Sequence, residues 1–342
     1  MQKLFLILSL VSFQMLAGEA DIKIPRSLCE DVDIRDQNPS LREFFSTPRS
    51  QDSIGWCYGF SAADLLSAEL ARPVSAAHTS ALYNKDVQSN FFWRLAYKFA
   101  PGSFDEVYEG GFVKKALKSV RNNQRVCLED DFPYDANMNG EFYYLVRNLE
   151  SLKERIENEQ VNDENKCLAI RRFINSEDNI NLNANELYAA LMSENLNIVL
   201  EQIASTRCGE NQISVPEMDF ASKSMPSLNR FSNESAEDAT RRHVRSLTRF
   251  FGTIDEKLKS GKPLSVDYNV KHITHDDGLH ASVLVARRWR NGRCEFKIRN
   301  SWGVGCSMYD RREITECNSS EGSYWVTDQK FYEMVNNITY ID

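Results

Sequence analysis

The chain has 342 residues, of which 42% are hydrophobic and 11% aromatic, and its formal net charge is −8. This negative balance argues against a nucleic-acid-binding protein, which needs a basic face. The hydrophobic content suffices for one large domain or two ordinary ones, since a domain typically has about 150 residues.

The first twenty residues have the features of a secretory signal peptide. Lys3 supplies a positive charge, residues 4–16 form an apolar run, and the small residues Ala17, Gly18 and Ala20 follow. This run is too short to span a bilayer, which takes about 20 residues, and no later segment is apolar enough. We therefore expect a secreted or periplasmic protein with no membrane anchor; a retained apolar N-terminus is the alternative.

Eight cysteines are spread along the chain, and an exported protein meets oxidising conditions in which disulfides form. They are Cys29, Cys57, Cys127, Cys167, Cys208, Cys294, Cys306 and Cys317. Spacing leaves their connectivity open: Cys306 with Cys317 would close a short loop, and Cys167 with Cys208 would staple a middle segment. If Cys57 stays a thiol, at least one further cysteine also stays outside a disulfide.

Apolar residues at helical spacing predict helices in the N-terminal and middle parts of the chain. After an extended N-terminal segment, these helices fall within 53–71 and over 113–120, 142–156 and 185–204. The first stops before Pro73, because proline restricts the residue that precedes it. A further helix over 254–259 ends at Ser260 and Gly261, with Pro263 beyond, which is a common helix stop.

The C-terminal part of the chain changes to strand-like runs. They cover residues 264–270, 281–289, 294–299 and 324–327. Asn291 and Gly292 separate the second run from the third, and Asn-Gly in this position is the strongest short hairpin signal. We therefore predict an α+β protein with helices mainly in the N-terminal part and strands in the C-terminal part.

One short stretch, residues 51–62, combines residue types that thiolate chemistry needs. Cys57 lies at or near the first turn of a predicted helix, where the helix dipole and a nearby imidazolium would lower the pKa of a thiol from about 8.5. A structural or disulfide role is the commoner explanation for a single cysteine. The flanking Gln51, Gly55 and Phe60 favour a nucleophile instead.

Two residues downstream complete a candidate site. His280 and Asn300 lie twenty residues apart, a separation that a hairpin can close. An imidazole general base needs one ring nitrogen facing the thiol and the other bonded to a fixed acceptor, and Asn300 would be that acceptor. Trp302 would cover this hydrogen bond from water. Each residue alone has an ordinary structural explanation, but their order, followed by Gly303, favours a site.

Together these residues resemble the active site of papain-like cysteine proteases. That family has a glutamine six residues before Cys-Trp-x-Phe-Ser, and residues 57–61 here are Cys-Tyr-Gly-Phe-Ser. The resemblance implies that Cys57 is the nucleophile and that His280 is the general base and acid, oriented by Asn300. Gln51 and the backbone N–H of Cys57 would form the oxyanion hole, in which one donor is worth about 3 kcal/mol.

Further stretches extend the resemblance to roughly 24–134 and 254–341. Gly110 and Gly111 match the family's Gly-Gly, where the substrate backbone approaches too closely for a side chain, and Trp302 would also line the substrate site. No cofactor and no metal is implied. The implied fold has two lobes, a helical one that carries Cys57 and an antiparallel, β-barrel-like one that carries His280 and Asn300.

The chain departs from the family in three places. Ile54 and Tyr108 stand where the family has a disulfide beside the nucleophile, so we expect packing alone to hold the nucleophile loop. Leu279 precedes the histidine, where Asp or Asn is common. The family's second Trp-Gly is replaced at 304–306 by Val-Gly-Cys.

Cys57 and His280 are 223 residues apart, against about 130–150 in the family. The excess predicts an insertion between the lobes. The expected organisation is a signal peptide at 1–20, a helical lobe at 21–134, a mostly helical insertion at 135–250 and a β-rich lobe at 251–342. The insertion is either inert or a lid or exosite, and it is a candidate binding site for an inhibitor or partner.

The function that the resemblance implies is an exported cysteine endopeptidase acting on peptides or proteins. An exopeptidase or transpeptidase of the same chemistry is one alternative, and an inactive binding protein on the same scaffold is another. Intact Cys57, His280, Asn300 and Gln51 argue against the inactive protein, and the altered loop after Trp302 argues weakly for it. The loop with His272, His275, Asp276 and Asp277 fits a hydrated loop better than a metal site.

Overall fold

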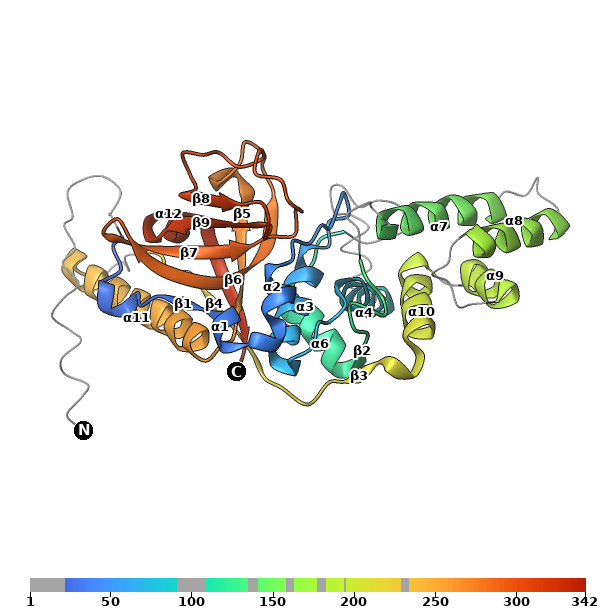
Figure 1. The fold of residues 1–342 in the computed structure, drawn as a ribbon, viewed down its shortest axis with the longest axis horizontal. Coiled ribbons are helices and arrows are strands. Elements are labelled where there is room, and N and C mark those ends of the chain that lie inside the picture. Colours follow the sequence, from blue (N-terminus) through green and yellow to red (C-terminus); the bar gives the residue numbers. More distant parts are fainter. Residues whose placement is uncertain are drawn as a thin grey trace. The chain divides into compact units, whose positions relative to one another are not determined.

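The computed structural model describes residues 22–90, 109–134, 141–157, 163–176, 183–193, 195–228 and 234–342. The predicted signal peptide, residues 1–20, lies outside the described residues. The chain divides into two units (Figure 1). Unit 1 consists of Met1–Pro48, Asp219–Asn300 and Val304–Asp342, and unit 2 consists of Arg49–Met218 and Ser301–Gly303.

Unit 1 is built on an antiparallel sheet with the strand order β4-β10-β5-β6-β7-β9-β8, and β1 pairs with β6 outside this order. The strands are β1 Val32–Asp33, β4 Phe220–Ser224, β5 Leu264–Asn269, β6 Leu279–Arg290, β7 Arg293–Arg299, β8 Glu316–Asn318, β9 Ser323–Thr327 and β10 Val335–Ile341. Asn291 and Gly292 join β6 to β7 with φ values of 52° and 78°, as a two-residue hairpin turn requires. The predicted strands and hairpin are therefore confirmed.

Unit 1 also contains helices, some of which contact this sheet. They are η1 Arg26–Leu28, α1 Ile34–Gln37, η2 Pro39–Leu41, α2 Arg42–Ser46, α11 Ala236–Lys259, η4 Val270–His272 and α12 Asp328–Met334. Helix α11 contacts β1 and β5, and the predicted helix 254–259 is only its last part. Phe251 of α11 stacks on Phe296 of β7 with ring centroids 6.0 Å apart, and Phe331 of α12 lies 4.4 Å from Phe296. These three rings form an aromatic core.

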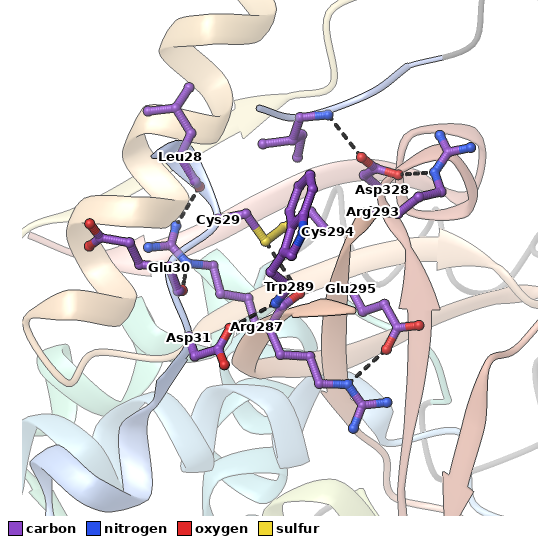
Figure 2. Close-up of a disulfide and its surroundings, with 12 residues drawn as sticks. Leu28, Cys29, Glu30, Asp31, Arg287, Trp289, Arg293, Cys294, Glu295 and Asp328 are labelled. Atoms are coloured by element: carbon purple, nitrogen blue, oxygen red, sulfur yellow. Dashed lines mark hydrogen bonds and ion pairs between the residues drawn. A yellow bond between two sulfur atoms is a disulfide. The ribbon is translucent and has the colours of Figure 1, made fainter. Parts of the chain in front are cut away.

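The N-terminal segment of unit 1 is fixed to the sheet, as Figure 2 shows. A disulfide joins Cys29 to Cys294 at the start of β7. Arg287 of β6 donates hydrogen bonds to the carbonyl oxygens of Glu30 and Leu28 at 2.8 and 3.1 Å. The segment is therefore an integral part of unit 1.

Unit 2 is mainly helical. Its elements are α3 Cys57–Leu70, α4 Ala76–Ser89, α6 Val113–Asn123, β2 Arg125–Val126, α7 Glu141–Glu157, α8 Asp163–Ser176, α9 Ala184–Ser193, α10 Leu196–Cys208, η3 Gly209–Asn211 and β3 Ile213–Ser214. The predicted helices at 113–120 and 142–156 are confirmed by α6 and α7. The single helix predicted over 185–204 is wrong, because Asn195 caps a new helix by accepting a hydrogen bond from the N–H of Asn197.

Three disulfides join six of the cysteines. The pair Cys306–Cys317 is confirmed. The pairing of Cys167 with Cys208 is wrong, because Cys208 at the end of α10 bonds to Cys127, which follows β2. Cys57 and Cys167 lie outside the three disulfides, in agreement with the expectation of at least two such thiols.

The predicted strand-like runs left out β1, β2, β3, β4, β8 and β10. Of these, β3 and β4 fall in the span that was expected to be mostly helical. Strand β4 pairs with β10 and so belongs to the sheet of unit 1. No helix in the described ranges has the length and the apolar character that crossing a membrane requires.

Candidate functional site

Cys57 is the first residue of α3 and is half-buried. The N–H groups of a helix's first turn lack partners within the helix, and the helix dipole places partial positive charge there. Trp56, which precedes Cys57, is fully buried, and its ring lies 5.4 Å from that of Phe142 at the start of α7. The thiol therefore stands at the positive end of a helix whose entry is fixed by aromatic packing.

Gln51 holds the loop that leads into α3. Its backbone N–H donates to the carbonyl of Ser301 at 2.8 Å, and its side-chain Oε1 accepts from the hydroxyl of Ser301 at 2.6 Å. Its Nε2 donates to the carbonyl of Ile54 at 3.1 Å, and the hydroxyl of Tyr134 donates to the carbonyl of Gln51 at 2.7 Å. The expectation that packing alone holds this loop is wrong, because these hydrogen bonds also hold it.

The segment 301–303 runs antiparallel to residues 49–51 within unit 2. Ser50 and Trp302 form an isolated antiparallel bridge, and the N–H of Gly303 donates to the carbonyl of Arg49 at 2.8 Å. Two motifs that lie about 250 residues apart in sequence therefore meet in one unit.

His280 and Asn300 form a buried pair in unit 1, at the start of β6 and just after β7. The ring Nε2 of His280 lies 2.7 Å from Oδ1 of Asn300. The hydroxyl of Ser282 donates to the same oxygen at 3.1 Å, and Nδ2 of Asn300 donates to the hydroxyl of Tyr309 at 2.8 Å. With Oδ1 of Asn300 facing the ring, Nε2 of His280 carries the proton and Nδ1 of the neutral ring is an acceptor.

A chain of hydroxyl groups supports the oxygen of Asn300. Tyr324 donates to Tyr268 at 2.9 Å, Tyr268 lies 2.9 Å from Ser282, and Ser282 donates to Asn300. Since the Ser282 proton points to Asn300, Tyr268 must donate to Ser282. Of these residues, Ser282 had a sequence signal, because it lies two positions after the histidine on the same face of a strand; the two tyrosines and Tyr309 had none.

Burial sets the charge of this pair. It lowers the pKa of His280 to about 4, and the hydrogen bond to Asn300 offsets part of that shift. The ring of Tyr268 packs edge-on against His280 with centroids 5.5 Å apart. Burial also raises the pKa of Tyr309, so its hydroxyl keeps its proton at neutral pH. An imidazolium here therefore needs a negative charge beside it.

The two candidate glycines have structural reasons of their own. Gly110 has a φ of 74°, which favours glycine, and its N–H donates to the carbonyl of Gly55 at 2.8 Å. A Cβ on Gly111 would lie 2.8 Å from ring carbons of Tyr58 and Tyr83. Close packing within unit 2 thus requires glycine at 111, independently of any substrate.

The predicted site residues are divided between the two units. Unit 2 holds Cys57, Gln51, Gly110, Gly111 and Trp302, and unit 1 holds His280 and Asn300. Within unit 2, Gln51 and the segment with Trp302 share hydrogen bonds, and the backbone of Gly110 joins the same loop through Gly55. Across the part of the chain that the structure describes, no group of three or more His, Cys, Asp or Glu side chains is arranged to hold a metal ion.

No family model matches the chain, and no curated protein sequence matches it. Several solved structures are similar to it. SERA5E from Plasmodium falciparum is 10% identical with a TM-score of 0.45, and the match covers 93% of this chain and 98% of that one. The structure of pepw from Lactobacillus rhamnosis is 12% identical with a TM-score of 0.43, and the match covers 90% of this chain and 84% of that one. A digestive procathepsin L 3 of the Tenebrio molitor larval midgut is 13% identical with a TM-score of 0.40, and the match covers 93% of this chain and 71% of that one.

Proposed function

We propose that this chain is an exported, papain-like cysteine endopeptidase that hydrolyses bonds in peptides or proteins. The observation that carries the proposal is the buried pair of His280 and Asn300, joined at 2.7 Å. The amide of Asn300 holds the proton of the ring on Nε2, which leaves Nδ1 as the base. A general base needs this fixed tautomer.

The proposed reaction begins when the thiol of Cys57 passes its proton to Nδ1 of His280. The thiolate attacks the carbonyl carbon of the substrate, and the carbonyl oxygen takes up the negative charge. The imidazolium then protonates the leaving amine as the C–N bond breaks, which leaves a thioester. His280 next takes a proton from water, whose oxygen attacks the carbonyl carbon of the thioester. The C–S bond then breaks, the acid is released, and the sulfur of Cys57 regains its proton from His280.

Gln51 is the proposed side-chain donor to the oxyanion. Its amide nitrogen carries two protons, one of which goes to the carbonyl of Ile54 at 3.1 Å. The carbonyl of Ile54 can only accept, so it requires the nitrogen end of the amide, and the hydroxyl of Ser301 donates to the oxygen end at 2.6 Å. The second proton, with the N–H of Cys57, would stabilise the oxyanion by about 3 kcal/mol per donor.

The low pKa of His280 applies to the ring without a negative charge beside it. Burial disfavours an isolated imidazolium. In the proposed site the imidazolium forms only together with the thiolate of Cys57, which supplies the opposite charge. The thiol and the ring would then titrate as one pair.

Export is the cellular part of the proposal. Three disulfides hold the chain, and disulfides persist in oxidising compartments. The predicted signal peptide at 1–20 would take the chain there. A reductant would protect Cys57, which has to stay a thiol for this chemistry.

Iodoacetamide labelling at about pH 5.5 tests the proposal, because only about 0.1% of an ordinary thiol with a pKa near 8.5 is ionised there. Mass spectrometry would follow Cys57 and Cys167 in the same sample, so that Cys167 is an internal reference and Cys57→Ala is the control. We expect fast labelling of Cys57 and slow labelling of Cys167. Equal rates would contradict the thiolate–imidazolium pair and favour the binding-protein alternative.

A further inference from the structure

A basic cavity of about 350 Å³ lies on helices α7 and α8 of unit 2. Its lining includes Arg155 of α7 and Lys166 and Arg172 of α8, together with the apolar Ile156 and Leu168. Among the described residues, no Asp or Glu belongs to the lining. The volume lies at the lower end of the range for ligand sites, which suits one or two side chains of a peptide.

The two arginines of this cavity are exposed and available for a ligand. Within the described ranges neither Arg155 nor Arg172 forms an ion pair, whereas Arg147, nearer the start of α7, pairs with Glu150 at 2.8 Å. A guanidinium binds a carboxylate through two parallel hydrogen bonds. The cavity is therefore a local cationic site on a chain whose formal net charge is −8.

The apolar part of the lining narrows the choice of ligand. The side chain of Leu168 is 42% exposed, and Ile156 lies buried beside the arginine of α7. A polyanion such as a sulfated polysaccharide would use the cations and gain nothing from an exposed leucine. A peptide with an acidic side chain next to an apolar one would use both.

Helix α7 links this cavity to the start of α3. Phe142 of α7 packs on Trp56, the residue before Cys57, and Arg155 lies further along the same helix. At about 1.5 Å per residue, the helix covers roughly 20 Å between Phe142 and Arg155. An extended peptide at about 3.3 Å per residue covers the same length in about six residues.

We propose that this cavity is an exosite for an acidic segment of a protein substrate, in which a carboxylate side chain lies beside an apolar one. The segment would lie about six or more residues from the bond to be cleaved. The inference rests on the proposed peptidase function and gives the insertion predicted from the sequence a substrate-binding role.

A binding measurement tests the exosite without using catalysis. The full chain with Cys57→Ala is titrated against a fluorescein-labelled peptide that contains Glu-Leu-Glu, and binding is followed by fluorescence anisotropy at two salt concentrations. We expect Arg155→Gln and Arg172→Gln each to weaken binding about tenfold, which corresponds to about 1.4 kcal/mol, and high salt to weaken it further. Arg171→Gln is the matched control, because Arg171 is an exposed neighbour on α8 that is not among the lining residues.

Three results would overturn the exosite. They are equal losses in all three variants, no loss at Arg155 and Arg172, and displacement of the peptide by inorganic phosphate or a sulfated polysaccharide at lower concentrations than by unlabelled peptide. The last result would assign the cavity to a different anion.

Cleavage kinetics separate this inference from the proposed function. With otherwise wild-type enzyme, Arg155→Gln and Arg172→Gln should raise KM for a long substrate that carries the acidic segment and leave a short fluorogenic peptide unaffected. If the wild type cleaves neither substrate, the peptidase proposal fails while the binding result still stands. If it cleaves both and the arginine variants change neither, the exosite alone fails.

Discussion

Tyr309→Phe removes the acceptor that holds the amide of Asn300, and its effect can be worked out from the site. Nδ2 of Asn300 donates to the Tyr309 hydroxyl at 2.8 Å, in a place where both side chains are buried. A buried donor without a partner costs about 1–3 kcal/mol. The amide can avoid part of this cost by rotating, but rotation turns Oδ1 away from His280. We therefore expect kcat to fall about 5- to 150-fold, as 1–3 kcal/mol of barrier implies, with little change in KM.

Steady-state kinetics on a short peptide across pH would measure this effect. Tyr324→Phe is the matched control, because it removes a buried hydroxyl that the hydroxyls of Tyr268 and Ser282 separate from Asn300. Thermal unfolding of both variants shows how much general damage each change causes. The reasoning fails if Tyr309→Phe keeps the wild-type kcat, or if Tyr324→Phe lowers kcat as much at an equal loss of stability.

Three further predictions concern charge and packing. In Cys57→Ala, His280 should titrate near pH 4 in an NMR histidine titration, because burial lowers its pKa and no thiolate remains to offset this. A titration at the ordinary value of about 6.5 would contradict the effect of burial on this ring. Burial lowers the pKa of His78 to about 4 from 6.5, and its Nδ1 accepts the N–H of Cys127 at 3.0 Å. The folded state thus binds fewer protons than the unfolded state between these pH values, so the free energy of unfolding should fall by roughly 3 kcal/mol as the pH drops from 6.5 to 4. In denaturant unfolding, the free energy of unfolding of His78→Asn should lack this fall between pH 6.5 and pH 4. If the variant keeps the wild-type pH dependence, His78 is not its source. Gly111→Ala places a methyl group 2.8 Å from two tyrosine rings and should lower the free energy of unfolding by about 1–3 kcal/mol. If the variant keeps its stability and only KM changes, the packing explanation for this glycine is wrong and a role in substrate binding is left.

The hairpin between β6 and β7 and the helix α3 were predicted, because interactions between residues close in sequence determine both. The hairpin at Asn291 and Gly292 was predictable, because both residues adopt positive φ values that Asn and Gly tolerate. The place of Cys57 at or near the first turn of α3 followed from the apolar spacing after it. These features need no knowledge of distant parts of the chain.

Contacts between distant parts of the chain were beyond the sequence. The pairing of Cys127 with Cys208 depends on how α10 returns to β2, and spacing along the chain left the partner of Cys208 open. Tyr309 follows Asn300 closely in sequence, yet no periodicity marks it as the acceptor of the Asn300 amide. Strand β4 is short and polar, with mostly exposed residues, and it is a strand because β10 offers a free edge for pairing.

The boundary between the two units lies between Asn300 and Ser301, so these two neighbouring residues contribute to different parts of the proposed site. Asn300 belongs to unit 1 and fixes the proton of His280, whereas Ser301 belongs to unit 2 and fixes the amide of Gln51. One peptide bond therefore joins the residue that sets the proposed base to the residue that sets the proposed oxyanion donor. The sequence suggested a role for Asn300 and passed over the serine, whose hydroxyl donates to the oxygen end of the Gln51 amide. A loss of activity at Ser301 is accordingly expected to act through Gln51 and to leave the tautomer of His280 unchanged.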